Sequence, residues 1–243
     1  MKEVFDNYVL KFDMTDENIF YKYYHSFRVM TLCEELAKNL NLSSYDIEVA
    51  KVIGLFHDIG RFNQLKMNNS FDDTLLDHGN YGESLLRESN MLSNLGFDDD
   101  LEVIYKAISI HNKLKIEEGL NERELFFSKI IRDADKLDII YALGDEKLRT
   151  IKQVLDNVTL EVGRVFLNNC LVSKSLRKNY NDSLILIFSF IYDINFGYSF
   201  KILKERKYYD KLYDRIENKE LFKDYYEHLK EYINERIDKN VSK

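Results

Sequence analysis

The stretch GLFHDIGRF, residues 54–62, ends an apolar run with two polar side chains, His57 and Asp58. The residues before them, IEVAKVIGLF (47–56), are apolar on nearly every side. This pattern predicts a central, buried helix that ends at the histidine and the aspartate, with Gly60 as its stop. Two side chains that can bind a metal are therefore expected to lie in the core.

The rest of the chain favours an all-α fold. It contains no proline and only nine glycines, so long helices are uninterrupted and residues typical of tight β-turns are scarce. Apolar residues at helical spacing, with capping pairs before some of them, predict helices at 16–41, after Ser43 and Asp46, at 78–89, at 100–113 and after Asn121 and Glu124. Residues 61–77 lack this periodicity and are rich in Asn and Asp, which predicts a long loop.

No repeat or linker interrupts the 243 residues, so we expect one domain over 1–243. The longest apolar run, LILIFSFIYDI (184–194), is too short to span a bilayer and contains Asp193, so it is expected in the core. The first residues, MKEVFDNYVLKFDM, lack the apolar stretch of a signal peptide. These features favour a cytoplasmic protein that does not bind membranes.

The net charge of −7 argues against stable nucleic-acid binding, which relies on Lys and Arg side chains that neutralise phosphates. A small anion could still bind in a local basic pocket. The two cysteines, Cys33 and Cys170, are far apart and form no CxxC pair. We expect both to be buried thiols within helices, in a reducing compartment.

Four of the five histidines stand within helices or at their ends, beside a loop, and two aspartates accompany them: His25, His57, His78, His111, Asp58 and Asp135. Asp135 lies in a strongly apolar helix that is also expected to be buried. A buried carboxylate costs several kcal/mol unless it is paired or bound to a metal. Imidazole and carboxylate together form a ligand set that suits a divalent transition metal.

At these residues the chain resembles the HD-domain superfamily of metal-dependent phosphohydrolases, whose pattern is H…HD…D on a helical bundle. His25, His57, Asp58 and Asp135 match this pattern in order. The resemblance covers about residues 20–145, which leaves 146–243 as a C-terminal helical extension. It implies an all-α bundle of HD-domain type with additional C-terminal helices.

The resemblance also implies two metal sites. His78 in DHGNYGESLL and His111 in SIHNK match the extra histidines of the family members that bind two metals. By this correspondence His25, His57 and Asp135 hold the first metal, His78 and His111 hold the second, and Asp58 bridges both. The implied cofactors are one or two divalent ions among Fe, Mn, Zn, Co and Ni, with Mg as a further option.

The implied reaction is hydrolysis of a phosphoester or phosphoanhydride bond in a nucleotide or another small phosphorylated metabolite. A metal-bound water or hydroxide is then the nucleophile, and Asp58 bridges the metals that share it. Charge that develops on the phosphoryl oxygens requires nearby cations, for which Arg61 and Lys113 are the closest candidates in sequence. Lys136 and Arg28 are second choices, and Glu83 is a candidate to orient His78.

The sequence departs from two subgroups of this family. Members that cleave cyclic dinucleotides carry a Gly-Tyr-Pro motif, which a chain without proline lacks, and Asn112 stands where some two-metal members have another histidine. Two alternatives share the same scaffold: a mixed-valent di-iron oxygenase, and a non-enzymatic module that senses a nucleotide. Association of several copies of the chain is compatible with the sequence.

Overall fold

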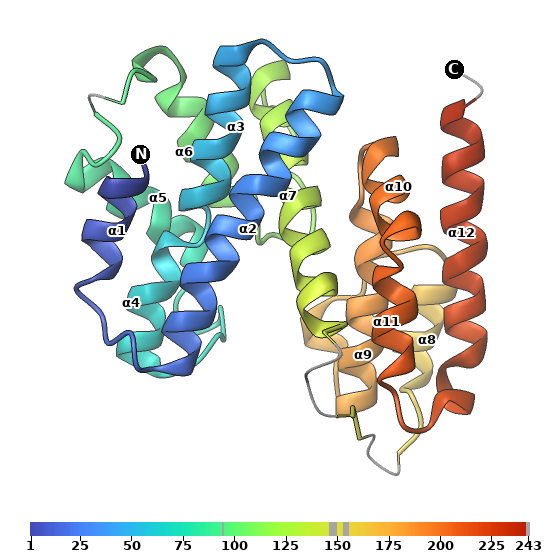
Figure 1. Cartoon of the computed structure of the whole chain (residues 1–243). Coiled ribbons are helices and arrows are strands. Elements are labelled where there is room, and N and C mark those ends of the chain that lie inside the picture. The colour runs from blue at the N-terminus through green and yellow to red at the C-terminus, as the bar shows by residue number, and fades with distance from the viewer. Residues whose placement is uncertain (94, 146–149, 153–155, 242–243) are drawn as a thin grey trace. The chain divides into compact units, whose positions relative to one another are not determined.

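A computed structural model describes residues 1–93, 95–145, 150–152 and 156–241, and their regular structure is helical (Figure 1). The expected all-α class is confirmed. Within these residues the only strand-like pairing is an isolated bridge between Ile151 and Ile216. None of the described helices combines the length and the hydrophobicity needed to cross a membrane.

The chain forms two compact units, Met1–Asp135 and Lys136–Lys243. The boundary falls inside helix α7 (Glu122–Leu143), earlier than the division near residue 145 that the sequence suggested. Whether the whole chain acts as a single domain stays a prediction. Each unit is described by itself below.

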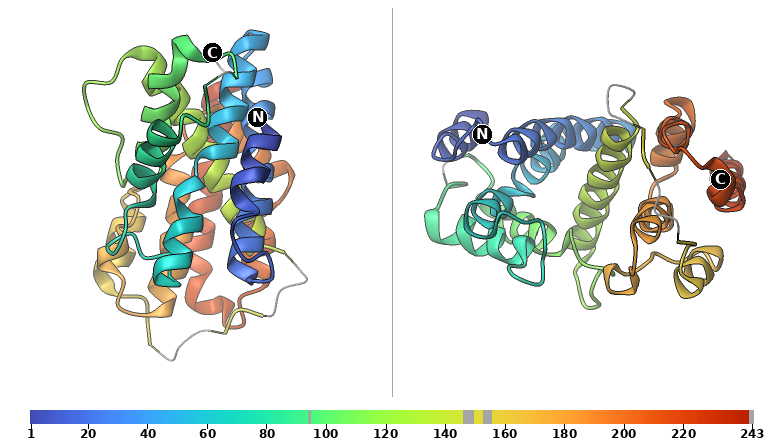
Figure 2. Two further views of the ribbon diagram at one scale, coloured as in Figure 1. Left: turned by 90° about the vertical axis from the view of Figure 1, so that its left-hand side faces the viewer. Right: turned by 90° about the horizontal axis from the view of Figure 1, so that it is seen from below.

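The first unit contains every residue of the expected metal site. Its helices are α1 (Lys2–Val9), α2 (Glu17–Asn39), α3 (Ser44–Phe56), α4 (Ile59–Asn68), α5 (His78–Ser89), the 3-10 turn η1 (Asp98–Asp100), α6 (Leu101–Ile110) and the first part of α7. α2 and α3 pack side by side as a helical hairpin, and α4, α5 and α6 pack in succession beside them (Figures 1 and 2).

Capping residues explain where the helices of the hairpin begin. The Asp16 side chain caps α2 by accepting hydrogen bonds from the backbone nitrogens of Asn18 and Ile19, at 2.8 and 3.3 Å. The Ser43 hydroxyl caps α3 by accepting from the Asp46 nitrogen at 3.1 Å, as expected from the sequence. Both bonds satisfy backbone donors that have no partner inside the helix.

The prediction of a long loop over 61–77, with Gly60 as a helix stop, is wrong for its first part. A short break at His57 and Asp58 follows α3, and α4 then runs from Ile59 to Asn68. Its buried residues Ile59, Phe62 and Leu65 recur every three positions, and the ring of Phe62 packs against those of Phe5, Tyr8 and Phe12. Tertiary packing therefore outweighs the weak helix propensity of the Asn-rich segment.

Gly60 allows two helices to approach each other closely and does not end one. A Cβ atom at residue 60 would overlap the carbonyl oxygen of His78 and lie 2.9 Å from the nitrogen of Gly82, both in α5. The absence of a side chain at Gly60 thus lets the start of α4 touch the start of α5. This contact brings the His57–Asp58 break next to His78.

The second unit contains the apolar stretch 184–194. Its elements are the last part of α7, α8 (Leu160–Leu167), η2 (Lys174–Leu176), α9 (Tyr180–Phe188), η3 (Ser189–Asp193), α10 (Gly197–Glu205), α11 (Tyr208–Asp214), η4 (Lys219–Phe222) and α12 (Lys223–Val241). Ile185, Phe188 and Ile191 are fully buried, which confirms the core position of this stretch.

One expectation about the cysteines is wrong. Cys33 is buried in α2, whereas Cys170 is exposed and lies after the end of α8. Asn169, directly before it, has a φ of +58°, so the chain leaves the helical conformation there. The apolar residues of α8 therefore pack into the core, whereas the Cys170 thiol lies beyond the end of the helix and stays exposed.

We predict that Gly60→Ala destabilises the protein by about 2–3 kcal/mol, because a methyl group at this position must push two backbones apart. Gly82→Ala is the matched control on the facing helix, since its Cβ would meet a side-chain methyl of Ile59 at 3.2 Å, which can shift more easily than backbone. The free energy of unfolding in urea measures both. Equal stability of the two variants would contradict the close contact of α4 and α5.

Candidate metal centre

His57 and Asp58 form the break between α3 and α4. The His57 ring is fully buried, and its Nδ1–H donates to the carbonyl oxygen of Gly54 at 2.8 Å, which leaves Nε2 to point away from α3. Asp58 stands at the N-cap of α4 but makes no capping hydrogen bond with its side chain. Its carboxylate is instead turned into the core, where the residue is 2% exposed.

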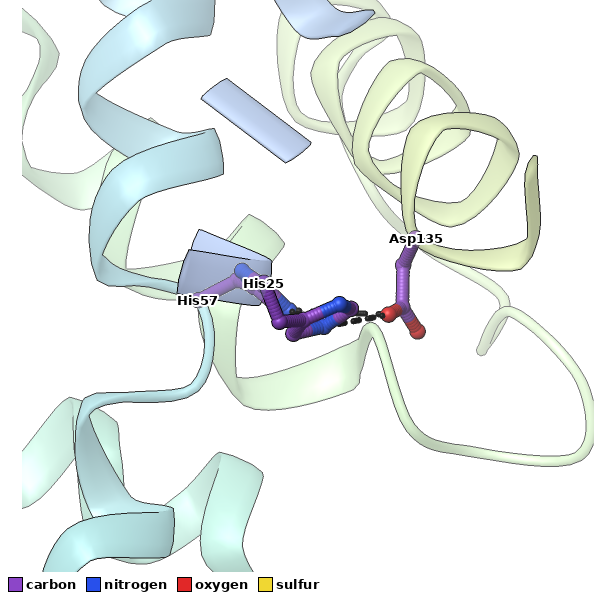
Figure 3. A group of neighbouring side chains, drawn as sticks. All are labelled: His25, His57 and Asp135. Atoms are coloured by element: carbon purple, nitrogen blue, oxygen red, sulfur yellow. Dashed lines mark hydrogen bonds and ion pairs between the residues drawn. The ribbon is translucent and has the colours of Figure 1, made fainter. Parts of the chain in front are cut away.

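The first group of converging side chains consists of His25, His57 and Asp135 (Figure 3). They come from the middle of α2, the end of α3 and the middle of α7. The Nε2 atoms of the two histidines are 3.2 Å apart, and Asp135 Oδ1 lies 3.2 Å from that of His25 and 3.6 Å from that of His57. Two imidazole nitrogens and a carboxylate oxygen thus surround one small volume.

A second group gathers on the other side of His57. His78 begins α5 and His111 follows the last residue of α6, and their Nε2 atoms are 3.0 Å apart. Asp58 Oδ1 lies 3.1 Å from Nε2 of His78 and 3.6 Å from Nε2 of His111. His57, Asp58 and His111 also satisfy the spacing of a metal site.

Asp58 lies between the two groups and offers one oxygen to each. Its Oδ2 is 3.4 Å from Nε2 of both His25 and His57, whereas its Oδ1 faces His78 and His111. This arrangement supports the bridging role that we expected for Asp58. The six side chains identified from the sequence therefore meet in one place in the first unit.

Neighbouring groups hold the ligand histidines in position. His111 Nδ1–H donates to the carbonyl oxygen of Ile108 at 2.6 Å, and the buried Arg132 donates to the carbonyl oxygens of Ile110 and His111 at 3.0 and 3.2 Å. His78 Nδ1 lies 2.5 Å from Asp73 Oδ1. Such partners fix the tautomer and orientation of metal-binding histidines.

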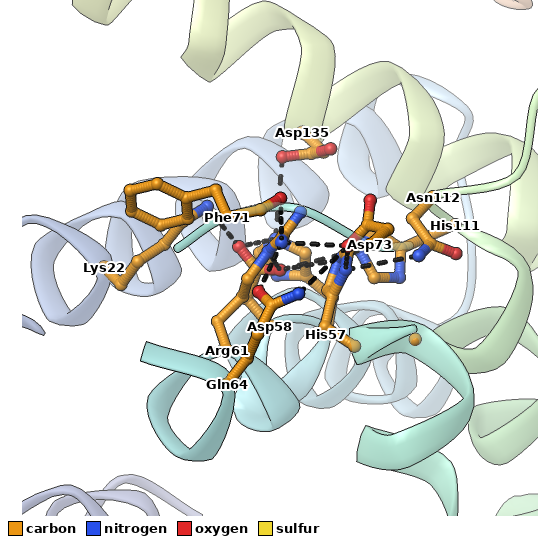
Figure 4. A network of polar contacts seen from close by, with 12 residues as sticks. Lys22, His57, Asp58, Arg61, Gln64, Phe71, Asp73, His111, Asn112 and Asp135 are labelled. Atoms are coloured by element: carbon orange, nitrogen blue, oxygen red, sulfur yellow. Dashed lines mark hydrogen bonds and ion pairs between the residues drawn. The ribbon is translucent and has the colours of Figure 1, made fainter. Parts of the chain in front are cut away.

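The donor set fits a divalent transition metal. With bonds of about 2.1 Å, adjacent ligand atoms are about 3.0 Å apart in an octahedron and about 3.4 Å apart in a tetrahedron. The separations within the two groups are 3.0–3.6 Å. One cationic side chain contacts this ligand set: Lys22 Nζ lies 2.5 Å from Asp58 Oδ2 (Figure 4).

The carboxylates of the site are held in their charged form. Burial would raise the pKa of Asp58, but the Lys22 ammonium and the neighbouring histidines hold it well below its usual range. Burial would likewise raise the pKa of Asp135, which hydrogen bonds from His25 and His57 instead keep well below its usual range. Both aspartates are thus ready to bind a cation at neutral pH.

The histidines differ in their protonation. Burial alone would lower the pKa of His57, but the charges of Asp58 and Asp135 outweigh it and raise that pKa to about 9. Burial lowers the pKa of His111 to about 4. Without a metal, His57 is therefore a positively charged imidazolium at neutral pH, with a proton on both nitrogens. His111 is neutral, and its Nε2 can act as a ligand.

Arg61, expected to bind substrate, is buried and engaged with the loop after α4. Its Nη1 donates to Gln64 Oε1 at 2.6 Å and to the carbonyl oxygen of Phe71 at 2.9 Å, and it forms an ion pair with Asp73 at 2.9 Å (Figure 4). Its Nε is 3.6 Å from Asp58 Oδ1. Arg61 therefore lies beside the ligand set, and its catalytic role stays a prediction.

The other basic candidates lie farther out. Lys113 pairs with Asp77, the N-cap residue of α5, and Arg28 lies over the ring of Tyr21. Lys136 pairs with Asp193 at 2.6 Å within the second unit. A catalytic role for Lys113 stays a prediction.

The sequence offered Glu83 as a candidate partner of a ligand histidine, beside the commoner alternative of an ordinary acid on a helix surface, and the structure agrees with the alternative. Glu83 pairs with Arg87 on its own helix, and Asp73 in the preceding loop contacts His78. Asp73 carried no readable signal, because its position depends on the course of an irregular loop. Gln64 holds that loop by donating to the carbonyl oxygens of Asp72 and Leu76 at 3.1 and 2.7 Å.

Lys22 was also missed, although a signal was available. It precedes His25 by three residues and therefore lies on the same face of α2, one turn earlier. Lysine side chains are mostly solvent-exposed, so the residue type itself pointed away from the core, although aromatic residues flank Lys22 in the sequence. The structure buries Lys22 to 8% exposure against Asp58.

The comparisons with known proteins agree with this geometry. Residues 23–140 match the family described as the HD domain, a range that contains all six converging side chains. No curated protein and no solved structure matches the chain.

We predict that variants divide the six residues into two sites that share Asp58. His111→Ala should remove one bound Mn²⁺ of two, and Asp58→Ala should weaken both sites by more than the roughly 10–100-fold that loss of an outer partner costs. His228→Ala is the control, because this half-buried histidine bonds to Asn169 in the second unit. Metal analysis after dialysis measures the stoichiometry. Two ions retained in Asp58→Ala would exclude the bridging role.

We predict that metal binding releases a proton from His57. Below the pKa of about 9 the metal must displace the Nε2 proton, so apparent Mn²⁺ affinity should rise with pH, by up to about tenfold per unit between pH 6.5 and 8.5. Calorimetry in buffers of different ionisation enthalpy counts the protons. Affinity that is constant over this range would mean that His57 is already neutral before the metal binds.

Proposed function

We propose that this chain, whose residues 23–140 match the HD-domain family, is a metal-dependent phosphohydrolase. The proposed reaction is cleavage of a phosphoester or phosphoanhydride bond in a nucleotide or another small phosphorylated metabolite. The observation that carries the proposal is the convergence of four histidines on the two oxygens of Asp58, with Asp135 facing two of these histidines. Packing alone does not account for such a set, because ionised carboxylates are costly to place in a core and four imidazoles point at them.

Divalent metals held by this set would polarise a phosphoryl group and lower the pKa of a coordinated water. The side chains that would hold these metals come from both sides of Asp58. His25, His57 and Asp135 form one side, His78 and His111 form the other, and Asp58 joins them. The Nδ1 hydrogen bonds of His57 and His111 to backbone carbonyls keep each Nε2 atom directed inward.

Charge around the site supports a phosphorylated substrate. Lys22 and Arg61 both lie within 3.6 Å of an Asp58 oxygen, so two fixed cations border the ligand set. Positive groups that are already in place stabilise charge on phosphoryl oxygens in the transition state. The overall charge of −7 instead disfavours a polyanionic partner, so we propose a small substrate, no stable nucleic-acid binding, no membrane binding and a cytoplasmic location.

The same six ligands also suit a di-iron oxygenase, which is the second candidate. Four histidines and two carboxylates with one shared carboxylate are compatible with iron as well as with Mn or Co. A non-enzymatic sensor of nucleotides is the third candidate. Its weakness is that the buried Asp58 and the half-buried Asp135 are both ionised and surrounded by complete ligand groups, which a binding module does not require.

We predict turnover that depends on the metal and on Asp58. Protein loaded with Mn²⁺, Co²⁺ or Fe²⁺ should release phosphate or pyrophosphate from at least one member of a panel of nucleotides and sugar phosphates, and a chelator should abolish this. Asp58→Asn should lower kcat at least about 100-fold, the loss typical of removing one electrostatic contact in an active site. His228→Ala should leave turnover unchanged. Chromatography identifies the product.

Three outcomes separate the candidates. Turnover that persists in chelator, or at full rate in Asp58→Asn, would contradict a metal-dependent hydrolase. Inactivity on the whole panel, together with two irons per chain and oxygen uptake, would support the oxygenase. Nucleotide binding without turnover under any metal would support the sensor.

A further inference from the structure

Lys22 occupies a position that the metal-site assignment leaves unexplained. Its Nζ lies 2.5 Å from Asp58 Oδ2, and the residue is 8% exposed. Asp58 Oδ2 is the same oxygen that faces His25 and His57 at 3.4 Å. An ammonium group therefore contacts the carboxylate oxygen that belongs to the first group of ligands (Figure 4).

The other nearby cations have closer partners outside the ligand set, although Arg61 Nε also lies 3.6 Å from Asp58 Oδ1. Arg61 is bound by Asp73, Gln64 and the carbonyl oxygen of Phe71, and Lys113 is bound by Asp77. In the part of the chain that the structure describes, Lys22 donates a hydrogen bond only to Asp58. Of these cations, Lys22 is the one whose position would change if another cation took Asp58 Oδ2.

Two aromatic rings flank the ammonium group. The centre of the Phe71 ring is 5.7 Å from Lys22 Nζ, and the centre of the Tyr21 ring is 5.9 Å from it. Both rings are partly exposed, at 39% and 38%, so this side of Lys22 lies toward solvent. Rings attract an ammonium group at this range, and the four-carbon stem of lysine lets the group move between neighbouring positions.

We propose that Lys22 is an internal counter-ion of the metal centre: it neutralises Asp58 in the metal-free protein, and a metal at the first site displaces it toward a phosphoryl oxygen of the substrate. The first half of this proposal concerns metal binding alone. The second half rests on the proposed phosphohydrolase function. No bond is made or broken in the displacement, because one cation replaces another at the same oxygen.

The physical reason is the cost of a buried charge. In the absence of metal, Asp58 needs a cation, and Lys22 supplies it at a small distance. When a divalent ion takes over Oδ2, the ammonium group loses that partner and retains only the two rings nearby. It then lies beside the partly exposed rings of Tyr21 and Phe71, where the oxygens of an anionic substrate would restore its hydrogen bonds.

Metal affinity tests the first half without any assay of activity. Lys22→Met keeps most of the stem and removes the competing charge, so Mn²⁺ should bind at least about tenfold tighter and raise Tm more on saturation than in the original protein. Lys38→Met is the matched control: it lies on the same helix and also removes an ion pair, that with Glu34 at 2.6 Å, but its side chain is 61% exposed. Unchanged or weaker Mn²⁺ binding in Lys22→Met would overturn the proposal and make Lys22 a brace for Asp58.

A second measurement does not require the metal-free variant to fold. Both proteins are purified loaded with Mn²⁺, and release of the ion to excess chelator is followed over time. Release should be slower from Lys22→Met, since no side chain is left to take the place of the ion. Release at an equal or higher rate would contradict the competition.

Inorganic phosphate tests the second half. Binding of phosphate to the Mn²⁺-loaded protein should weaken about tenfold or more in Lys22→Met, the loss of about one charged hydrogen bond, and remain unchanged in Lys38→Met. Equal phosphate affinity in both variants would overturn the substrate-binding role while the metal result stands. Failure of the original protein to bind phosphate or to hydrolyse any substrate would instead count against the proposed function.

Discussion

The ionised carboxylate of Asp58, buried among helices, is the constraint around which the first unit is arranged. A charge so far from water must be surrounded by groups of opposite sign or by metal, and four histidines and a lysine lie within reach of its two oxygens. Asp58 stands at a helix N-cap, where an aspartate commonly bonds to the backbone, yet it makes no such bond. The short break between α3 and α4 thus gives up local stabilisation to place a charge in the core.

Helix ends bring the ligands to this charge. His57 follows α3 and His111 follows α6, and each donates its Nδ1–H to the carbonyl oxygen three residues earlier, Gly54 or Ile108. Carbonyls at a helix C-terminus lack partners inside the helix, so the same bond satisfies the backbone and selects the tautomer whose Nε2 can bind a metal. Two positions of the chain therefore use one local arrangement, and the glycine contact between α4 and α5 brings His78 to meet them.

The ligands could be predicted from the sequence because their positions depend on local features, namely the ends of helices. Histidines and aspartates at the ends of strongly periodic helices could be recognised, because periodicity and capping pairs locate helix ends. The helix at 59–68 could not, since its Asn residues and Gly60 are typical of loops and only its packing against Phe5, Tyr8 and Phe12 makes it helical. Asp73 depends on the path of an irregular loop. Lys22 has the helical spacing to His25 that could have indicated its position, but a lysine is rarely expected to be buried.

The balance of charge in the site bears on the kind of substrate it accepts. The ligand set contains only two carboxylates, and its other members are histidines, which bind metal in their neutral form. Two divalent ions would leave an excess of two positive charges, and the Lys22 ammonium would add a third. The nearby acids Asp73 and Asp77 do not offset this excess, because Arg61 and Lys113 already neutralise them. A doubly charged phosphoryl group matches such a centre, whereas a neutral substrate would leave its charge uncompensated in a largely buried site.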